Sequence, residues 1–131
     1  MRRIVPVIAL AVALLLTGCT GFGIAELDRE QRDSDKLELP ERYEESLVDQ
    51  ESIRWLAEHD GVDFYAARSD LGVCLIMVRD GDTDGSMAGC TQKELKVEGM
   101  GFPTARFFID RPPPTAPDGM TQLTPNLYIA E

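Results

Sequence analysis

Short apolar segments of alternating pattern, separated by turn residues, run from Ile53 to Thr91 and restrict this chain to antiparallel β-structure. Asp60-Gly61 lies between two of these segments, and Asp-Gly favours a hairpin because a type I′ turn needs positive φ at both central residues. A second turn is expected at 69–72. The next segment, 73–78, is apolar throughout, as in a central strand that is covered on both faces. The sequence therefore predicts consecutive antiparallel strands joined by tight turns.

The two turns determine which residues pair. Residues at equal distances from a tight turn face each other, so Trp55 is expected opposite Ala66 and Phe64 opposite Met77. This register gives the first three strands one wholly apolar face, made of Trp55, Ala57, Phe64, Ala66, Leu75 and Met77. A slip of one residue would scatter this set over both faces, which favours the register.

The N-terminus has the pattern of an export signal. Arg2 and Arg3 precede thirteen uninterrupted apolar residues, 4–16. This run is shorter than the about 20 residues that an ordinary membrane-spanning helix needs, and it fits the apolar region of a signal peptide. The following Leu16-Thr17-Gly18-Cys19 resembles the lipobox of bacterial lipoproteins. The resemblance implies cleavage after residue 18 and a diacylglycerol on the thiol of Cys19.

This resemblance also implies a location and a first partner. Stable attachment to a bilayer takes two or more acyl chains, which a diacylglyceryl group supplies. We therefore expect a lipid-anchored protein on the extracytoplasmic face of the cell membrane, with Cys19 as the anchor. An ordinary signal peptide, with Cys19 left as a stray thiol, is the alternative. The chain also looks like the many short uncharacterised lipoproteins of Gram-positive bacteria, especially from Glu58 to Cys90, which implies no activity.

The other two cysteines are predicted to form a disulfide. With Cys19 assigned to lipid, Cys74 and Cys90 are the remaining pair, and exported proteins fold in an oxidising setting. Centring the third hairpin on Asp82 places Cys74 opposite Cys90, at a Cα separation of ~4.5–5.5 Å that a disulfide accepts. A zinc site is disfavoured because two cysteines and the single histidine, His59, cannot fill its shell without carboxylates.

Residues 24–51 differ in composition from the rest of the chain. They contain eleven acidic and four basic residues, a net charge of −7, and few large apolar side chains. This composition predicts a solvated tether, disordered or partly helical, that holds the domain off the bilayer. A short helix is expected to begin at Pro40, with Tyr43 and Leu47 on one face. The expected organisation is a signal peptide at 1–18, a lipidated acidic tether at 19–51 and a small β domain at 52–131.

Further strands are predicted beyond the first three. The segments 86–91, 94–98, 104–109 and 126–129 have suitable patterns. Pro112–Pro114 cannot donate to a strand ladder and is expected to cross an end of the sheet. The expected fold is mainly β, with six or seven strands in a small antiparallel meander that forms a curled sheet or a partly closed barrel.

The segment after the third strand resembles, over six residues, the opening of an EF-hand calcium loop. Asp80, Asp82 and Asp84, followed by Gly85, supply alternating carboxylates that can converge on a hard cation. The twelfth position, where that pattern has a bidentate glutamate, is Thr91, and strands rather than helices are predicted on both sides. We therefore favour an acidic hairpin tip without a metal, with Asp80, Asp82 and Asp84 as the calcium candidates.

The sequence contains no familiar catalytic signature. It has no Gly-x-Ser-x-Gly elbow, phosphate-binding Gly-Lys-Ser/Thr loop, His-Glu-x-x-His zinc motif or dinucleotide fingerprint. His59 lies in a predicted turn, where it has neither a nucleophile nor a cleft. We expect no enzyme activity and no cofactor.

Charge limits the remaining functions. The formal net charge is −10, from 13 Lys and Arg against 23 Asp and Glu, and it becomes −12 without the signal peptide. Such a charge argues against nucleic-acid binding, which needs Lys and Arg. One expectation is a non-catalytic interaction or structural module of the cell envelope, with an envelope protein as partner. The alternative is a lipoprotein inhibitor of a cationic envelope-active enzyme such as lysozyme, because an acidic domain attracts basic partners.

Overall fold

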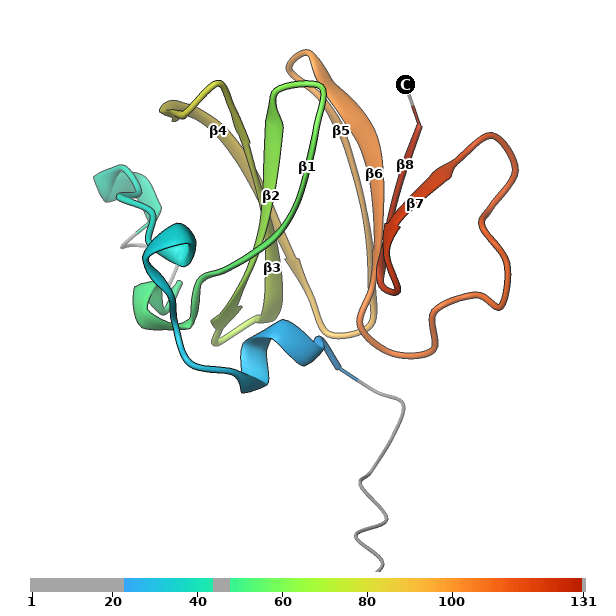
Figure 1. Ribbon diagram of the computed structural model, residues 1–131, viewed down its shortest axis with the longest axis horizontal. Coiled ribbons are helices and arrows are strands. Elements are labelled where there is room, and N and C mark those ends of the chain that lie inside the picture. Colours follow the sequence, from blue (N-terminus) through green and yellow to red (C-terminus); the bar gives the residue numbers. More distant parts are fainter. Residues whose placement is uncertain (1–22, 44–47, 131) are drawn as a thin grey trace, which may run out of the picture.

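The computed structural model describes residues 23–43 and 48–130, which form two four-stranded antiparallel sheets (Figure 1). Sheet 1 is a meander in the order β1-β2-β3-β4, and sheet 2 has the order β5-β6-β8-β7. The strands are β1 (Arg54–His59), β2 (Val62–Ser69), β3 (Gly72–Arg79), β4 (Asp82–Thr91), β5 (Glu94–Gly99), β6 (Phe102–Phe108), β7 (Thr121–Thr124) and β8 (Leu127–Ala130). The predicted mainly β, antiparallel fold is therefore confirmed. The lipobox and Cys19 lie outside the described residues.

The described part of the chain has eight strands, compared with the six or seven predicted. The additional strand, β7, shows no apolar alternation, and its first two residues are exposed. Strand β4 is also longer than predicted. It begins at Asp82 because the chain turns tightly at Asp80-Gly81, where both residues have positive φ, instead of forming a wider loop centred on Asp82.

The predicted register is confirmed for most of sheet 1. Phe64 lies opposite Met77 along an uninterrupted β2–β3 ladder. Cys74 lies opposite Cys90 in the β3–β4 ladder. The two turns and the apolar pattern were therefore sufficient to define the β2–β3 pairing. The pairing of Cys74 with Cys90 is also as predicted, but a register shift between Met77 and Arg79 produces it in place of the expected loop centred on Asp82.

A β-bulge makes the prediction for the start of β1 wrong. The register shifts between Trp55 and Ala57, so Trp55 lies opposite Tyr65 instead of Ala66. Leu56 is consequently buried in the core, whereas Trp55 is 38% exposed. Trp55 thus belongs to the outer face of the sheet, because an extra residue reverses the alternation.

The two sheets pack against each other through their apolar faces and enclose the main core. Its buried members are Ile24, Leu27, Leu56, Val62, Phe64, Ala66, Leu75, Met77, Val97, Ala105, Phe107, Leu127 and Ile129. Two of them, Ile24 and Leu27, precede the first strand. Burial of large apolar side chains contributes about 1.5–3 kcal/mol each, so this cluster is the principal source of stability.

The N-terminal segment covers the opposite face of sheet 1. A second buried cluster on that face consists of Ile53, Tyr65, Ala67, Ile76 and Val78, and partly buried Leu37, Leu39, Val48 and Ala88 pack against it. Strand β3 is therefore enclosed on both faces, which explains why the segment 73–78 is apolar throughout.

The expectation of a solvated tether is wrong for the described part of residues 24–51. Most of its charged side chains are exposed, but Ile24 and Leu27 enter the main core, and Leu37, Leu39 and Val48 pack against the second cluster. The irregular spacing of these few apolar residues among acidic ones hid the burial. The segment forms four short 3₁₀ helices: η1 (Ala25–Asp28), η2 (Asp33–Asp35), η3 (Glu41–Tyr43) and η4 (Gln50–Ser52). Of the helix expected from Pro40, the described residues show only the three-residue 3₁₀ helix η3, and residues 44–47, Leu47 among them, lie outside the described residues.

A buried carboxylate joins this segment to sheet 1. Asp35 is fully buried and accepts hydrogen bonds from Nη1 and Nη2 of Arg29, at 2.5 and 2.8 Å. It also accepts from the backbone N–H of Arg32 at 2.7 Å and of Trp55 at 2.8 Å. Arg54 donates from Nε and Nη2 to the carbonyl oxygen of Arg29, at 2.9 and 2.8 Å. We refer to Arg29, Asp35 and Arg54 as the clasp.

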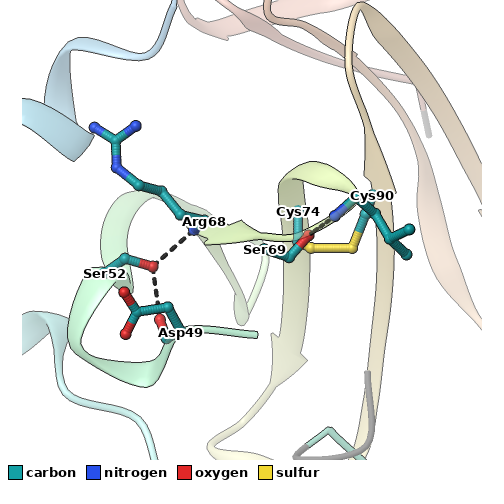
Figure 2. Close-up of a disulfide and its surroundings, with 7 residues drawn as sticks. Asp49, Ser52, Arg68, Ser69, Cys74 and Cys90 are labelled. Atoms are coloured by element: carbon teal, nitrogen blue, oxygen red, sulfur yellow. Dashed lines mark hydrogen bonds between the residues drawn. A yellow bond between two sulfur atoms is a disulfide. The ribbon is translucent and has the colours of Figure 1, made fainter. Parts of the chain in front are cut away.

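Residues 48–52 continue sheet 1 beside the end of β2 (Figure 2). Val48 forms an isolated antiparallel bridge with Ser69. The Asp49 N–H donates to the Arg68 carbonyl oxygen at 2.9 Å, and the Arg68 N–H donates to Ser52 Oγ at 2.7 Å. Ser52 Oγ in turn donates to the Asp49 carbonyl oxygen at 2.6 Å. Residues 48–52 therefore supply hydrogen-bond partners to the backbone at the end of β2, where β1 no longer lies beside it.

The predicted disulfide between Cys74 and Cys90 is confirmed (Figure 2). It joins adjacent residues of β3 and β4, with a Cα separation of 3.9 Å. Cys74 is fully buried, and Cys90 is half-buried. The bridge lies on the face of sheet 1 that carries Tyr65 and Ile76, as the register predicted, and the N-terminal segment covers this face.

We expect Cys74→Ser to lower the melting temperature by well over ten degrees. Closing a loop of this size stabilises by about 3 kcal/mol in the chain-entropy model, and small domains lose ~4–8 °C per kcal/mol. Thermal unfolding followed by circular dichroism tests this. Cys90→Ser should lower the melting temperature by the same amount as Cys74→Ser, and the double variant should be no less stable than either single variant. A shift of only a few degrees would contradict the prediction.

We expect the clasp to make the stability of the fold depend on pH in the acid range. Hydrogen bonds from Arg29 hold the pKa of the Asp35 carboxyl well below its usual range. A carboxyl whose pKa is lower in the folded state stabilises the fold above its unfolded-state pKa, and this contribution is lost as the pH falls toward the folded-state value. Asp35→Asn should therefore cost about 2–3 kcal/mol at neutral pH and lose less stability than wild type between pH 5 and about 2.

Urea unfolding at several pH values, followed by fluorescence of the single tryptophan, measures both effects. Asp33→Asn is the matched control, because Asp33 lies in the same helix with a fully exposed carboxylate. It should change stability by no more than ~0.5 kcal/mol. Equal effects of the two variants would refute a special role for Asp35.

Candidate functional site at the hairpin-turn end

Three tight turns lie at one end of the molecule, at the top of Figure 1. Asp60-Gly61 joins β1 to β2, Asp80-Gly81 joins β3 to β4, and Met100-Gly101 joins β5 to β6. All six residues have φ between 49° and 77°, as a type I′ hairpin requires. We call this end the turn end.

The described chain begins at the opposite end, which we call the base. The Gly23 N–H donates to the Ile109 carbonyl oxygen at 2.9 Å, and Asn126 Nδ2 donates to the Gly23 carbonyl oxygen at 3.3 Å. Ile109 directly follows β6, whose first residue lies at the turn end. The full length of a strand therefore separates Gly23 from the three turns (Figure 1).

Arg79 connects the two sheets at the turn end. It is the last residue of β3, and its Nη2 donates to the Gly101 carbonyl oxygen at 2.6 Å. Its guanidinium carbon lies 5.4 Å from the centre of the Phe102 ring, within the range of a cation–π contact. The hydrogen bond and the aromatic ring together hold an exposed arginine side chain in one position.

Two clefts lie on either side of Arg79 and Phe102. The first has a volume of about 320 Å³ and is lined by His59, Asp60, Val62, Arg79, Gly101, Phe102 and Pro103. The second, of about 340 Å³, is lined by Arg79, Asp80, Asp82, Gly85, Met100 and Phe102. These volumes are near the lower limit of small-molecule sites, about 300 Å³.

His59 lies in the first cleft beside an acid. Its Nε2 is 3.2 Å from Oδ2 of Asp60. A histidine with a carboxylate partner can act as a general base toward a suitably placed nucleophile. Among the described residues, the lining of this cleft contains no serine, threonine, cysteine or lysine side chain.

The rim of the turn end combines an apolar tip with carboxylates. Met100 is 76% exposed, which makes it the most exposed large apolar side chain among the described residues. The side chains of Asp60, Asp80, Asp82 and Asp84 are exposed around it and the two clefts. The surface thus offers an apolar contact surrounded by negative charge, with Arg79 at its centre.

The calcium candidates lie in this region but do not form a ligand set. Asp80 occupies a left-handed turn position, with φ of 51°. Asp82 uses Oδ1 to accept a hydrogen bond from the Gly85 N–H at 3.2 Å. Within residues 23–43 and 48–130, no group of three histidine, cysteine or acidic side chains is placed to hold a metal ion. The resemblance to an EF-hand is therefore limited to the sequence pattern, because these residues form a β-hairpin and not a calcium-binding loop.

The predicted residues do not gather at one site. Cys74 and Cys90 lie toward the base, close to the β2–β3 turn, while Asp80, Asp82 and Asp84 lie at the turn end. Sequence reasoning missed Arg79 and Phe102, which meet only when the two sheets pack. A signal was available in the spacing, since Asp60-Gly61, Asp80-Gly81 and Met100-Gly101 recur every twenty residues.

In the part that the structure describes, no helix has both the length and the apolar character needed to cross a membrane. No protein-family model, no curated protein and no solved structure matches this chain.

Proposed function

We propose that this protein is a membrane-anchored, extracytoplasmic lipoprotein that acts as a non-catalytic interaction module of the cell envelope. Leu16-Thr17-Gly18-Cys19 supports the anchor, and the Cys74–Cys90 disulfide supports an oxidising compartment. The observation that carries the proposal is the opposition of the two ends. The described part of the chain begins at the base, so an anchor at Cys19 leaves the clefts, Met100 and the carboxylates of the turn end facing away from the bilayer.

A second candidate function follows from the charge of the turn end. An inhibitor of a cationic envelope-active enzyme such as lysozyme needs an acidic surface that reaches a basic active-site region. Asp60, Asp80 and Asp82 surround the two clefts and supply such a surface. Both candidate functions use the turn end as the binding surface. They differ in that an inhibitor blocks the activity of the protein it binds, whereas an interaction module does not.

The anchor is tested at Cys19. Because the thiol carries the lipid in this proposal, Cys19→Ala should abolish labelling by a radioactive fatty acid and move the protein from the membrane to the soluble fraction. Thr20→Ala, the neighbouring change, should behave as wild type. Unchanged labelling and fractionation of Cys19→Ala would refute the lipoprotein assignment.

The turn end is tested by removing three charges there and three elsewhere. We expect Asp60→Asn, Asp80→Asn and Asp82→Asn together to weaken capture of an envelope partner by about tenfold or more, since charge pairs at an interface contribute to affinity. The matched control combines Glu30→Gln, Glu38→Gln and Glu41→Gln, which are exposed on the N-terminal segment, and it should retain binding.

Lysozyme activity measured with the same three proteins separates the two candidates. An inhibitor slows bacterial lysis, and the turn-end variant loses this effect while the control variant keeps it. An interaction module leaves lysis unchanged. Equal loss of capture in both triple variants would contradict a specific role of the turn end.

A further inference from the structure

We infer that the base of the domain rests directly against the lipid headgroups, so that the molecule stands upright on the bilayer. This inference rests on the proposed lipid anchor at Cys19 and concerns how the folded domain is held. It replaces the expectation of a long acidic tether with a short connection.

The packed structure begins only four residues after the proposed anchor. Gly23 is hydrogen-bonded to Ile109 and Asn126, and Ile24 is 3% exposed in the main core. Four steps of at most ~3.6 Å place the Cα of Gly23 within roughly 14 Å of the Cα of Cys19. The headgroup layer of one leaflet is itself about 5–8 Å thick, so the base cannot lie far from it.

The contacts within the base connect Gly23 to the β2–β3 turn. The Ile109 carbonyl oxygen accepts from Gly23, while the Ile109 N–H donates to the Lys93 carbonyl oxygen at 2.8 Å. Lys93 lies in the β4–β5 turn, next to Gln92. The backbone of Gln92 packs closely on Gly72. A Cβ added to Gly72 would lie only 3.2 Å from the Cα of Gln92. Gly23, Lys93 and the 69–72 turn therefore form one continuous surface (Figure 1).

That surface offers an apolar side chain and charges of both signs. Leu71 is 59% exposed at the tip of the β2–β3 turn. Arg68, Asp70 and Lys93 are exposed in or beside the two turns, and Arg68 forms an ion pair with the exposed Asp28 at 3.2 Å. An apolar side chain inserts among headgroups favourably, and the basic groups offset the acidic ones near anionic lipid.

The turn end is unsuited to the same contact. Glu58, Asp60, Asp80, Asp82, Asp84 and Glu98 are exposed there, with Arg79 and Lys96 as the nearby exposed cations. Anionic headgroups repel this end, so charge favours contact through the base. The eight residues of β3 place the turn end about 25 Å farther from the bilayer, which makes the two ends distinguishable.

Tryptophan quenching tests this arrangement. The full lipidated protein carries Trp55→Phe, which removes the single native tryptophan, together with Leu71→Trp at the base or Met100→Trp at the turn end. Gln92→Trp is a second base reporter, should Leu71→Trp perturb its turn. Each protein is reconstituted in phosphatidylcholine–phosphatidylglycerol vesicles that contain a phospholipid spin-labelled on its headgroup. We expect about threefold or stronger quenching at positions 71 and 92 than at 100, given the separation of the two ends.

The controls separate failure of this inference from failure of the anchor. Flotation of the wild-type protein with the vesicles tests the anchor alone, and its absence would overturn both proposals. If the protein floats and positions 71, 92 and 100 are quenched equally, the anchor stands and the upright arrangement is refuted. Inserting eight glycine and serine residues after Cys19 should reduce the quenching at Leu71→Trp while flotation is kept. Unchanged quenching after this insertion would show that the short connection does not hold the base in place, and would also overturn the inference.

Discussion

The buried carboxylate of Asp35 is the interaction on which the rest of this fold depends. A charged group without water must be fully hydrogen-bonded, and Asp35 meets this requirement with Arg29 and two backbone N–H groups. One of these N–H groups belongs to Trp55 of β1 and the other to Arg32, so the same carboxylate orders the N-terminal segment and attaches it to sheet 1. The attached segment supplies Leu37, Leu39 and Ile53 to the outer face of that sheet. Without the N-terminal segment, sheet 1 would expose one of its two faces to water, although its central strand β3 is apolar on both.

The sequence was informative wherever local rules act alone. Asp60-Gly61, the turn at 69–72 and the apolar alternation were enough to predict the first three strands. Cys74 lies opposite Cys90 as predicted, although a tight turn at 80–81 and a register shift between Met77 and Arg79 replace the expected loop. These features depend on residues close in the chain, whose turn geometry and side-chain period leave few alternatives. The β1 bulge escaped prediction because its cause lies outside the strand, in the hydrogen bond from Trp55 to Asp35, twenty residues away.

The same distinction explains what was missed in the N-terminal segment and at the candidate site. A net charge of −7 over 24–51 suggested solvation, and composition does not reveal that a few irregularly spaced apolar residues and one aspartate are buried. Arg79 and Phe102 belong to different sheets, and their contact exists only after the sheets have packed. Short β7 gave no pattern at all, since its place beside β8 follows from the chain returning after the proline-rich loop.

The three type I′ turns also make this molecule a natural display scaffold. Each turn is a two-residue connection at the end of a hairpin, and the disulfide lies away from the turn end. Lengthening a surface loop costs little stability, because closure entropy rises only by about 0.6 kcal/mol for each doubling of its length. Variable peptides inserted at Gly61, Gly81 and Gly101 would project side by side from a rigid sandwich, as the binding loops of an antibody domain do. Diversity at these three positions, between relatives or in a library, would therefore change recognition while leaving the core untouched.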